Sequence, residues 1–209
     1  MARRSGAVVL IAGPDGVGKS TLADGLAASG PVGRKVVRVH QRPRLLPRRT
    51  VHEGPVREPH ARRPYPSWLS AMKVLYMYLD VVLGWFVRLR PIARRGDLVL
   101  LERGWWDLVV DPRRYRLRGV GGLSRRLGQV MPQPDLVLIL EAPPALIHGR
   151  VPELPEAELA RQVAAWHAVL PPDVARVILD ATRPPAAVRD EAMAAISTRL
   201  EGGATRRLG

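Results

Sequence analysis

The chain has 209 residues, a formal net charge of +14 and no cysteine. This length suits one packed domain and is short for two, and the lack of cysteine excludes disulfides and cysteine-based metal sites. The positive charge favours nucleic acid, an anionic membrane or a phosphorylated ligand as partner, and alone it does not choose among them.

The first predicted element is a buried strand at 7–12, which leads directly into a glycine-rich loop and a helix. Residues 13–21 read Gly-Pro-Asp-Gly-Val-Gly-Lys-Ser-Thr and fill every fixed position of the phosphate-binding pattern G-x-x-x-x-G-K-S. Backbone N–H groups at the start of the helix can wrap a phosphate chain, because glycine permits their close approach. We expect Lys19 to reach the β- and γ-phosphates and Ser20 to bind Mg²⁺. The expected nucleotide ligands in this loop are Gly13, Asp15, Gly16, Val17, Gly18, Lys19, Ser20 and Thr21.

A second strand is predicted at 35–40, and the following stretch 41–66 is rich in proline and arginine. A segment of this length without predicted structure is either a solvated loop or a functional one. Ligands of open α/β sheets bind beyond the carboxyl ends of the strands, where this segment begins. In the second interpretation 41–66 is a substrate loop, and Arg42 and Arg44 contact the substrate.

A long helix is predicted from Ser67, as its N-cap, to about Arg95. Its interior at 74–87 is apolar nearly all round, with Asp80 as the single charge. Such a helix is buried on more than one side, and we expect core packing together with a homodimer contact through 67–95. Peripheral contact with a membrane surface is the alternative. No apolar run reaches the roughly 20 residues of a membrane-spanning helix, so a soluble cytoplasmic protein is expected.

A third strand at 98–101 ends in Glu102 and Arg103. Beside a phosphate loop, Glu102 is well placed to hold Mg²⁺ through water, and Arg103 could bind a second phosphate. The segment 105–116 combines carboxylates with aromatic and guanidinium planes, which would make a poor core. We expect it to form a pocket for a hydroxylated, phosphorylated ligand. The candidate substrate ligands from this segment are Asp107, Asp111, Arg113, Arg114 and Tyr115.

A joint at 119–122 and a short basic helix at 123–130 precede a fourth strand at 136–140. A helix–loop–helix at about 148–162 could be a lid over a phosphoryl donor, with Arg150 and Arg161 neutralising charge during transfer. The alternative is a helical hairpin with two exposed arginines. A fifth strand at 174–179, a closing helix at 186–200 and a frayed tail at 202–209 complete the chain.

The alternation of strands and helices predicts one α/β domain over residues 1–209. The expected architecture is a three-layer P-loop NTPase fold with a five-stranded, mostly parallel sheet and a helical lid. The chain contains no asparagine. The guanine-reading Asn-Lys-x-Asp motif of regulatory GTPases is therefore absent, which argues against that class.

Together these motifs resemble the thymidylate kinase-like branch of the nucleoside monophosphate kinases over about 7–200. The resemblance rests on the loop 13–21, on Glu102-Arg103 in place of the usual Asp-Arg, on Pro134-Asp135-Leu136 and on the lid arginines. It implies ATP and Mg²⁺ as cofactors. It also implies that Asp15 lies near the acceptor, that Arg103 holds the acceptor phosphate and that Arg150 and Arg161 close on ATP. Thr182 and Arg183 would lie near the adenine.

A narrower resemblance, to members found with polysaccharide-assembly genes, rests on 101–116, on 42–47 and on the helix ending at 89–91. The loop after the second strand reads Gln-Arg-Pro-Arg and lacks the Arg-Glu-Pro-Gly-Gly sequence of thymidylate kinases.

The expected function is ATP-dependent phosphoryl transfer to a small phosphate acceptor, first of all a nucleoside monophosphate. A sugar, glycan or lipid-linked acceptor, or a polynucleotide end, is the alternative. A nucleic-acid partner is not favoured, because the arginines are spread through loops without a zinc-finger or RRM signature. The residues expected to act in catalysis are Asp15, Lys19, Arg103, Arg150 and Arg161.

Overall fold

The computed structural model describes residues 6–31, 34–40, 45–46 and 63–205. Its centre is one sheet in which all four strand pairs are parallel, in the order β2-β3-β1-β4-β5. The predicted α/β class with a five-stranded parallel sheet is therefore confirmed. The strands are β1 Ala7–Ala12, β2 Val36–Val39, β3 Leu98–Leu101, β4 Leu136–Glu141 and β5 Arg176–Asp180.

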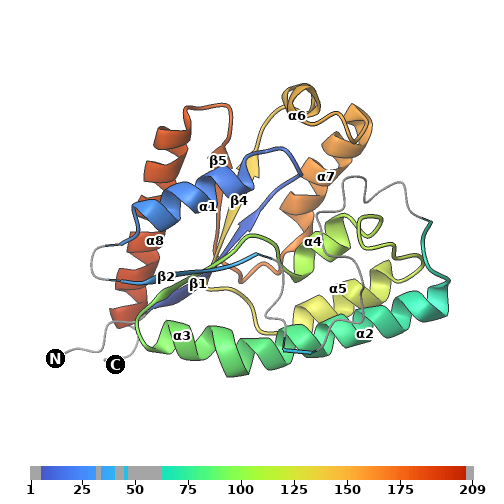
Figure 1. Ribbon diagram of the computed structural model, residues 1–209, viewed down its shortest axis with the longest axis horizontal. Coiled ribbons are helices and arrows are strands. Elements are labelled where there is room, and N and C mark those ends of the chain that lie inside the picture. The colour runs from blue at the N-terminus through green and yellow to red at the C-terminus, as the bar shows by residue number, and fades with distance from the viewer. Residues whose placement is uncertain (1–5, 32–33, 41–44, 47–62, 206–209) are drawn as a thin grey trace.

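Helices cover both faces of the sheet, which gives three layers (Figure 1). The central strand shows why: every residue of β1 is buried, and successive side chains enter different cores. Val9 and Ile11 join the core under α1 and α8, whereas Leu10 and Ala12 join the core under α2 and α4. The helices are α1 Lys19–Ala28, α2 Ser67–Gly84, α3 Arg90–Arg94, α4 Trp105–Val110, α5 Gly121–Val130, α6 Pro144–Arg150, α7 Glu156–Val169 and α8 Pro185–Thr205.

The predicted long helix is present, and it runs through α2, a π-helical stretch at Trp85–Leu89 and α3. The wide π turn lies directly before Pro91, whose ring clashes with the carbonyl four residues earlier in a regular α-helix. Ser67 is the first helical residue, and the N-cap is Pro66, so the predicted serine cap is wrong.

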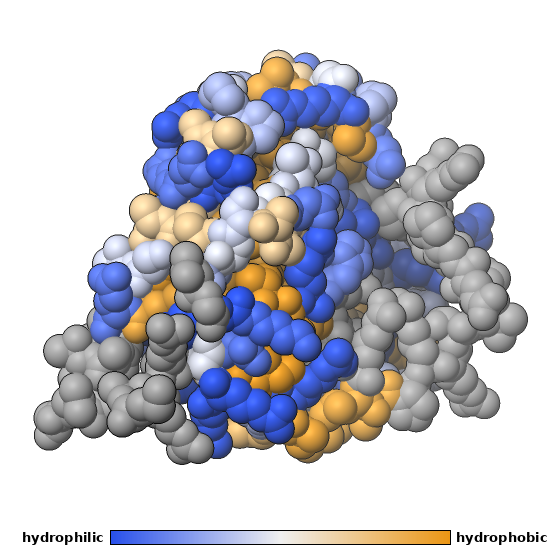
Figure 2. Space-filling view, turned by 60° about the vertical axis from the view of Figure 1, so that its left-hand side comes forward, coloured by the Kyte–Doolittle hydropathy of each residue, from blue (hydrophilic) through white to orange (hydrophobic). Residues whose placement is uncertain are grey.

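This helix buries one face in the core and leaves an apolar face exposed in the single chain, so the expected core packing is present and the expected dimer contact stays a prediction. Val74 and Leu89 are fully or nearly fully buried, whereas Phe86 is 60% exposed. Figure 2 shows apolar surface along the lower edge of the molecule, where Figure 1 places this helix. The exposed apolar face consists of Trp68, Met72, Leu75, Tyr76, Leu79, Leu83, Phe86 and Val87.

The helix Ser67–Arg94 is also long and apolar enough to cross a membrane by length and composition, with a mean hydropathy of 1.4 in its most apolar window. The sequence expectation that no run reaches this length is therefore wrong. Only 33% of that window is buried, and core helices of soluble proteins pass the same test. Length and composition thus leave the environment of the exposed face open.

Three further expectations differ from the structure. Trp105, Trp106 and Tyr115 are buried in the core beside Val74, because their rings supply the apolar surface that packs under α2. Helix α5 begins at Gly121, so half of the predicted joint is helical. Helix α8 extends to Thr205, beyond the predicted start of the frayed tail.

Two glycines of α5 give a matched test of this packing. A Cβ at Gly128 would lie 2.6 Å from a ring carbon of Trp106, whereas nothing lies within 4 Å of a Cβ at Gly122. We expect Gly128→Ala to lower the free energy of unfolding by about 1–3 kcal/mol, because the overpacked tryptophans must shift. Gly122→Ala should be neutral or stabilising by up to about 1 kcal/mol. Chemical denaturation of both variants checks this, and equal losses would contradict the packing described for Gly128.

Candidate functional site

The loop between β1 and α1 has the backbone that its glycines predict. Gly13, Gly16 and Gly18 have φ angles of 135°, 82° and 109°, in the left-handed region that side chains disfavour. A Cβ at Gly13 would also lie 2.6 Å from the carbonyl oxygen of Leu140, near the carboxyl end of β4. The loop therefore depends on glycine both for its angles and for its contact with the neighbouring strand.

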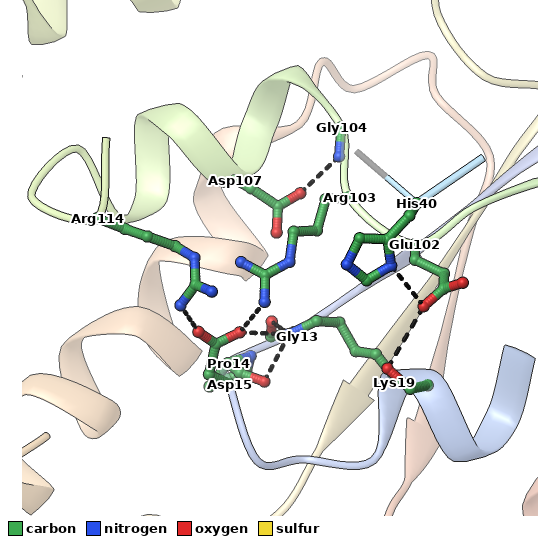
Figure 3. A network of polar contacts seen from close by, with 11 residues as sticks. Gly13, Pro14, Asp15, Lys19, His40, Glu102, Arg103, Gly104, Asp107 and Arg114 are labelled. Atoms are coloured by element: carbon green, nitrogen blue, oxygen red, sulfur yellow. Dashed lines mark hydrogen bonds and ion pairs between the residues drawn. The ribbon is translucent and has the colours of Figure 1, made fainter. Parts of the chain in front are cut away.

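Lys19 opens α1 and folds back over this loop. Its Nζ donates hydrogen bonds to the carbonyl oxygens of Gly13 at 2.6 Å and Pro14 at 2.8 Å, and it lies 3.2 Å from Oδ1 of Asp15 (Figure 3). The side chain is only 8% exposed. Burial lowers the pKa of Lys19 to about 8, and the negative charge of Asp107 opposes this shift.

Asp15 is the point at which three cationic side chains meet. Its Oδ1 accepts a hydrogen bond from Arg103 at 2.8 Å in addition to the contact with Lys19. Its Oδ2 forms an ion pair with Arg114. Figure 3 shows the two guanidinium groups approaching this one carboxylate from the segments after β3 and after α4. The cations therefore converge from three separate segments.

Glu102 follows β3 and is 4% exposed. Its Oε1 accepts hydrogen bonds from Arg38 Nε at 3.1 Å and Nη2 at 2.7 Å. Its Oε2 lies 3.1 Å from His40 Nδ1 and 3.4 Å from Ser20 Oγ. The sequence analysis missed Arg38 and His40. One feature of the sequence could have identified them: they are two residues apart at the carboxyl end of the second strand. This spacing places both side chains on the same face of the sheet.

The pair Ser20 and Glu102 fits the predicted role in Mg²⁺ binding. Both offer hard oxygen atoms, and Mg²⁺ takes one or two protein oxygens and completes its shell with phosphate and water. Among the residues that the structure describes, no group of three or more His, Cys, Asp or Glu side chains could hold a metal. A Mg²⁺ ion here would therefore take most of its ligands from a bound phosphate chain and water.

A pocket of about 290 Å³ lies beside the glycine loop, and we call it the glycine-loop pocket. The structure brings Arg150 of α6 and Arg183 to it, as predicted for groups that contact a nucleotide. Thr182 does not line it, and its Oγ1 donates a hydrogen bond to Asp180 at 2.6 Å. The residues lining the pocket are Gly16, Val17, Gly18, Thr21, Leu22, Leu140, Arg150, Ala181, Arg183, Pro185 and Val188.

A second, polar pocket lies on the other side of the loop, and we call it the carboxylate pocket. It brings together six predicted site residues with two residues of α7, Gln162 and Trp166, to which the sequence analysis gave no role in the site. Both are almost fully buried, and no short motif marks them. The lining residues are Gly13, Asp15, Arg103, Asp107, Val110, Asp111, Arg114, Gln162 and Trp166.

Asp107 lies at the wall of this pocket and also stabilises the start of α4. Its Oδ2 accepts a hydrogen bond from the backbone N–H of Gly104 at 2.7 Å. Burial raises the pKa of Asp107, and the nearby charge of Lys19 opposes the shift. Asp111 instead accepts a hydrogen bond at 3.1 Å from the backbone N–H of Arg114.

Several predicted ligands lie outside both pockets. Arg113 is exposed, and Tyr115 is buried in the core. Arg161 is paired with Glu158 and donates to the carbonyl oxygen of Val110 at 2.8 Å, so it fixes α7 against α4 instead of facing the glycine-loop pocket. Arg42 and Arg44, with most of the predicted substrate loop, lie outside the described residues.

The predicted lid corresponds to α6, the segment 151–155 and α7. Its two helices contact each other, and each contributes to a different pocket. Arg150 at the end of α6 lines the glycine-loop pocket, whereas Gln162 and Trp166 of α7 line the carboxylate pocket. This hairpin therefore contributes residues to both pockets. A lid over the two pockets would occupy this position.

No model of a known protein family and no curated protein matches the chain. Among solved structures, the thymidylate kinase of Candida albicans is similar, with a TM-score of 0.58 at 17% sequence identity. The likeness covers 93% of this chain and 92% of that chain. It shows the fold: the chain shares the three-layer α/β fold of that thymidylate kinase, as predicted.

The lowered pKa of Lys19 predicts a proton linkage. The pKa of Lys19 is about 8 in the folded protein, against an ordinary value of 10.5. Between pH 8 and 10.5 the unfolded chain therefore keeps the proton that the folded protein has lost. The free energy of unfolding rises with pH in this range. A bound triphosphate would favour the charged ammonium and raise the pKa. We therefore expect ATP binding near pH 9 to take up most of one proton and to weaken by up to about tenfold per pH unit.

Calorimetry at about pH 9 in two buffers of different ionisation enthalpy measures this uptake. Lys19→Met is the control and should remove the buffer dependence. Binding enthalpies that are equal in both buffers for the unaltered protein would contradict the linkage.

Proposed function

We propose that this protein transfers the γ-phosphoryl group of ATP to a small acceptor. One observation carries the proposal: Lys19 of a complete phosphate loop and the arginine Arg103 lie within reach of the same carboxylate, Asp15. The donor cradle and a cationic acceptor site thus adjoin each other. Phosphoryl transfer depends mainly on such positioning and on stabilisation of charge, with little covalent chemistry by the protein.

The two pockets divide the substrates between them in this proposal. The glycine-loop pocket takes the nucleoside of ATP, and Arg150 and Arg183 contact its phosphates or base. Lys19 orients the β- and γ-phosphates, while Ser20 and Glu102 hold Mg²⁺, which supplies neutralisation of charge on the transferred phosphoryl group. The acceptor approaches through the carboxylate pocket, whose open volume is about 10 Å³, so its side chains must move to admit the acceptor.

A nucleoside monophosphate is the first candidate acceptor. Arg103 and Arg114 supply the cationic groups that its phosphate needs, and the fold is that of thymidylate kinases. The similar Candida albicans enzyme is described as having broad substrate specificity, so the base need not be thymine. A sugar, glycan or lipid-linked acceptor is the second candidate, since Asp107 and Asp111 could accept hydrogen bonds from hydroxyl groups.

The test is ATP turnover by purified protein with Mg²⁺ against nucleoside monophosphates, simple sugars and sugar phosphates. Lys19→Ala should lower turnover by at least about 10²-fold, because it removes a cation that acts on the charge of the transition state. Glu102→Gln should raise the Mg²⁺ concentration needed for half-maximal activity. Turnover that survives Lys19→Ala unchanged would exclude phosphoryl transfer at this loop.

We also propose that two copies associate through the exposed apolar face of α2 and the π-helical stretch. The support is its eight large, exposed apolar side chains on one continuous helix, since contiguous exposed apolar patches commonly mark interaction sites. Leu79→Glu with Leu83→Glu should convert a dimer into a monomer, because it would bury four like charges in a symmetric contact.

Light scattering after size exclusion measures the mass. Val130→Glu, which changes a side chain that is 73% exposed on α5, is the control and should leave the mass unchanged. A monomeric unaltered protein would contradict the proposal. Pelleting of such a monomer with anionic vesicles would support membrane contact instead.

A further inference from the structure

Arg116 has a backbone conformation that side chains disfavour. Its φ angle is 57°, and among the residues that the structure describes it is the one residue other than glycine with a positive φ. In this left-handed region the Cβ crowds the following carbonyl oxygen, so surrounding contacts must hold the residue there. Strained residues of this kind cluster at ligand-binding sites. Arg116 lies two residues after Arg114, which lines the carboxylate pocket.

Tyr65 contacts both the side chain and the backbone of Arg116. The guanidinium carbon of Arg116 lies 4.1 Å from the centroid of the Tyr65 ring, and Nη1 donates a hydrogen bond to the Tyr65 hydroxyl at 3.1 Å. The backbone N–H of Tyr65 donates to the carbonyl oxygen of Arg116 at 2.9 Å. A cation over an aromatic face is attracted by the charge distribution of the ring. The left-handed conformation of Arg116 is therefore stabilised by the segment directly before α2.

Tyr65 is itself fixed against α2. The hydroxyl of Ser70 donates a hydrogen bond to the carbonyl oxygen of Tyr65 at 3.3 Å. Lys73 Nζ lies 5.1 Å from the centroid of the Tyr65 ring and donates to the carbonyl oxygen of Tyr115 at 2.7 Å. Lys73 therefore contacts both Tyr65 and the residue that follows Arg114. Helix α2 thus sets the place of Tyr65 relative to the pocket wall.

The conformation of Arg116 closes the turn that presents Arg114. The backbone N–H of Leu117 donates to the carbonyl oxygen of Pro112 at 2.9 Å. Within this turn Arg114 forms an ion pair with Asp15 in the carboxylate pocket (Figure 3). The chain reverses at Arg116, directly before Leu117, so a different φ there would carry Leu117 away from Pro112 and open the turn. The direction of Arg114 therefore depends on the conformation of Arg116.

We propose that Tyr65 is a positioning residue of the carboxylate pocket. It does not line the pocket; it holds Arg116 in the left-handed region, and that conformation directs Arg114 toward Asp15. The consequence for catalysis rests on the proposed function, because Arg114 affects turnover only where the acceptor enters this pocket. The positioning is a property of the protein without ligand, so the two levels can fail separately.

Hydrogen exchange of single backbone amides tests the positioning without a ligand. Tyr65→Leu should speed up exchange of the Leu117 amide by at least about tenfold, because the turn that protects it opens more often. Tyr65→Phe keeps the ring over Arg116 and should change this rate by less than about threefold. The amide of Leu138, in the middle of β4, reports global unfolding. Equal acceleration at both amides would mean a general loss of stability and would overturn the local role.

Arg116→Gly and Arg116→Ala are a matched pair of variants. Both remove the guanidinium group, but only glycine adopts the φ angle of residue 116 without strain. The Leu117 amide should therefore exchange roughly fivefold or more faster in Arg116→Ala than in Arg116→Gly. Equal rates in the two variants would show that this φ angle does not keep the turn closed, which would overturn the proposal even where Tyr65→Leu fails to fold.

Steady-state kinetics with ATP and Mg²⁺ test the consequence for the reaction. The acceptors compared are thymidine monophosphate and glucose 6-phosphate. Tyr65→Leu should raise the KM of the accepted one by roughly tenfold and leave the KM of ATP within about twofold, because the turn does not line the glycine-loop pocket. Tyr65→Phe should restore the acceptor KM.

The two levels of the proposal give different failures. Equal rises in the KM of acceptor and of ATP would overturn a role confined to the carboxylate pocket. Failure of the unaltered protein to turn over nucleoside monophosphates, sugars and sugar phosphates would overturn the proposed function. The exchange rates of the Leu117 amide would then still decide whether Tyr65 positions Arg114.

Discussion

The burial of positive charge beside the glycine loop is the constraint on which the rest of the site depends. Lys19 is 8% exposed and pairs with Asp15, as do Arg103 and Arg114. Removing a charge from water is costly unless opposite charges and hydrogen bonds replace the water. The four carboxylates of the site supply that replacement. Arg38 is neutralised in the same way by Glu102, which also faces Ser20.

The topology explains why these groups can meet although they are distant in sequence. In the order β2-β3-β1-β4-β5, the carboxyl ends of β2, β3 and β1 are neighbours at one edge of the sheet. His40, Glu102 and the loop at Gly13 follow those three ends directly. The helical hairpin after β4 then closes over the same edge from the other side. Ligands bind at such edges in open α/β sheets, and here two pockets flank the glycine loop.

The sequence was sufficient for the fold and for the geometry of the glycine loop, because both are coded locally, whereas it did not show that Thr182 and Arg161 lie away from the glycine-loop pocket. The strand–loop–helix at 7–28 carries its own fixed pattern, and the residues after β3 follow from their place at a strand end. The residues of the carboxylate pocket were predicted less well. Tyr115 and Arg113 were expected in the pocket because the carboxylates, aromatic rings and guanidinium groups of 105–116 were expected to make a poor core. Which of them face the core is decided by α2 and α7, which pack against that segment from far along the chain.

The sequence analysis missed three site residues for the same reason, namely Gln162, Trp166 and Arg38. Each of them reaches the site only through tertiary contacts. The charges show what such contacts add. Around the glycine loop, Lys19, Arg38, Arg103 and Arg114 oppose Asp15, Glu102, Asp107 and Asp111. Arg150 and Arg183 at the glycine-loop pocket add two further positive charges, so the site is net positive, as is the whole chain at +14. The local sequence shows where arginines occur, but only the contacts between distant segments decide which of them face the two pockets and which are neutralised.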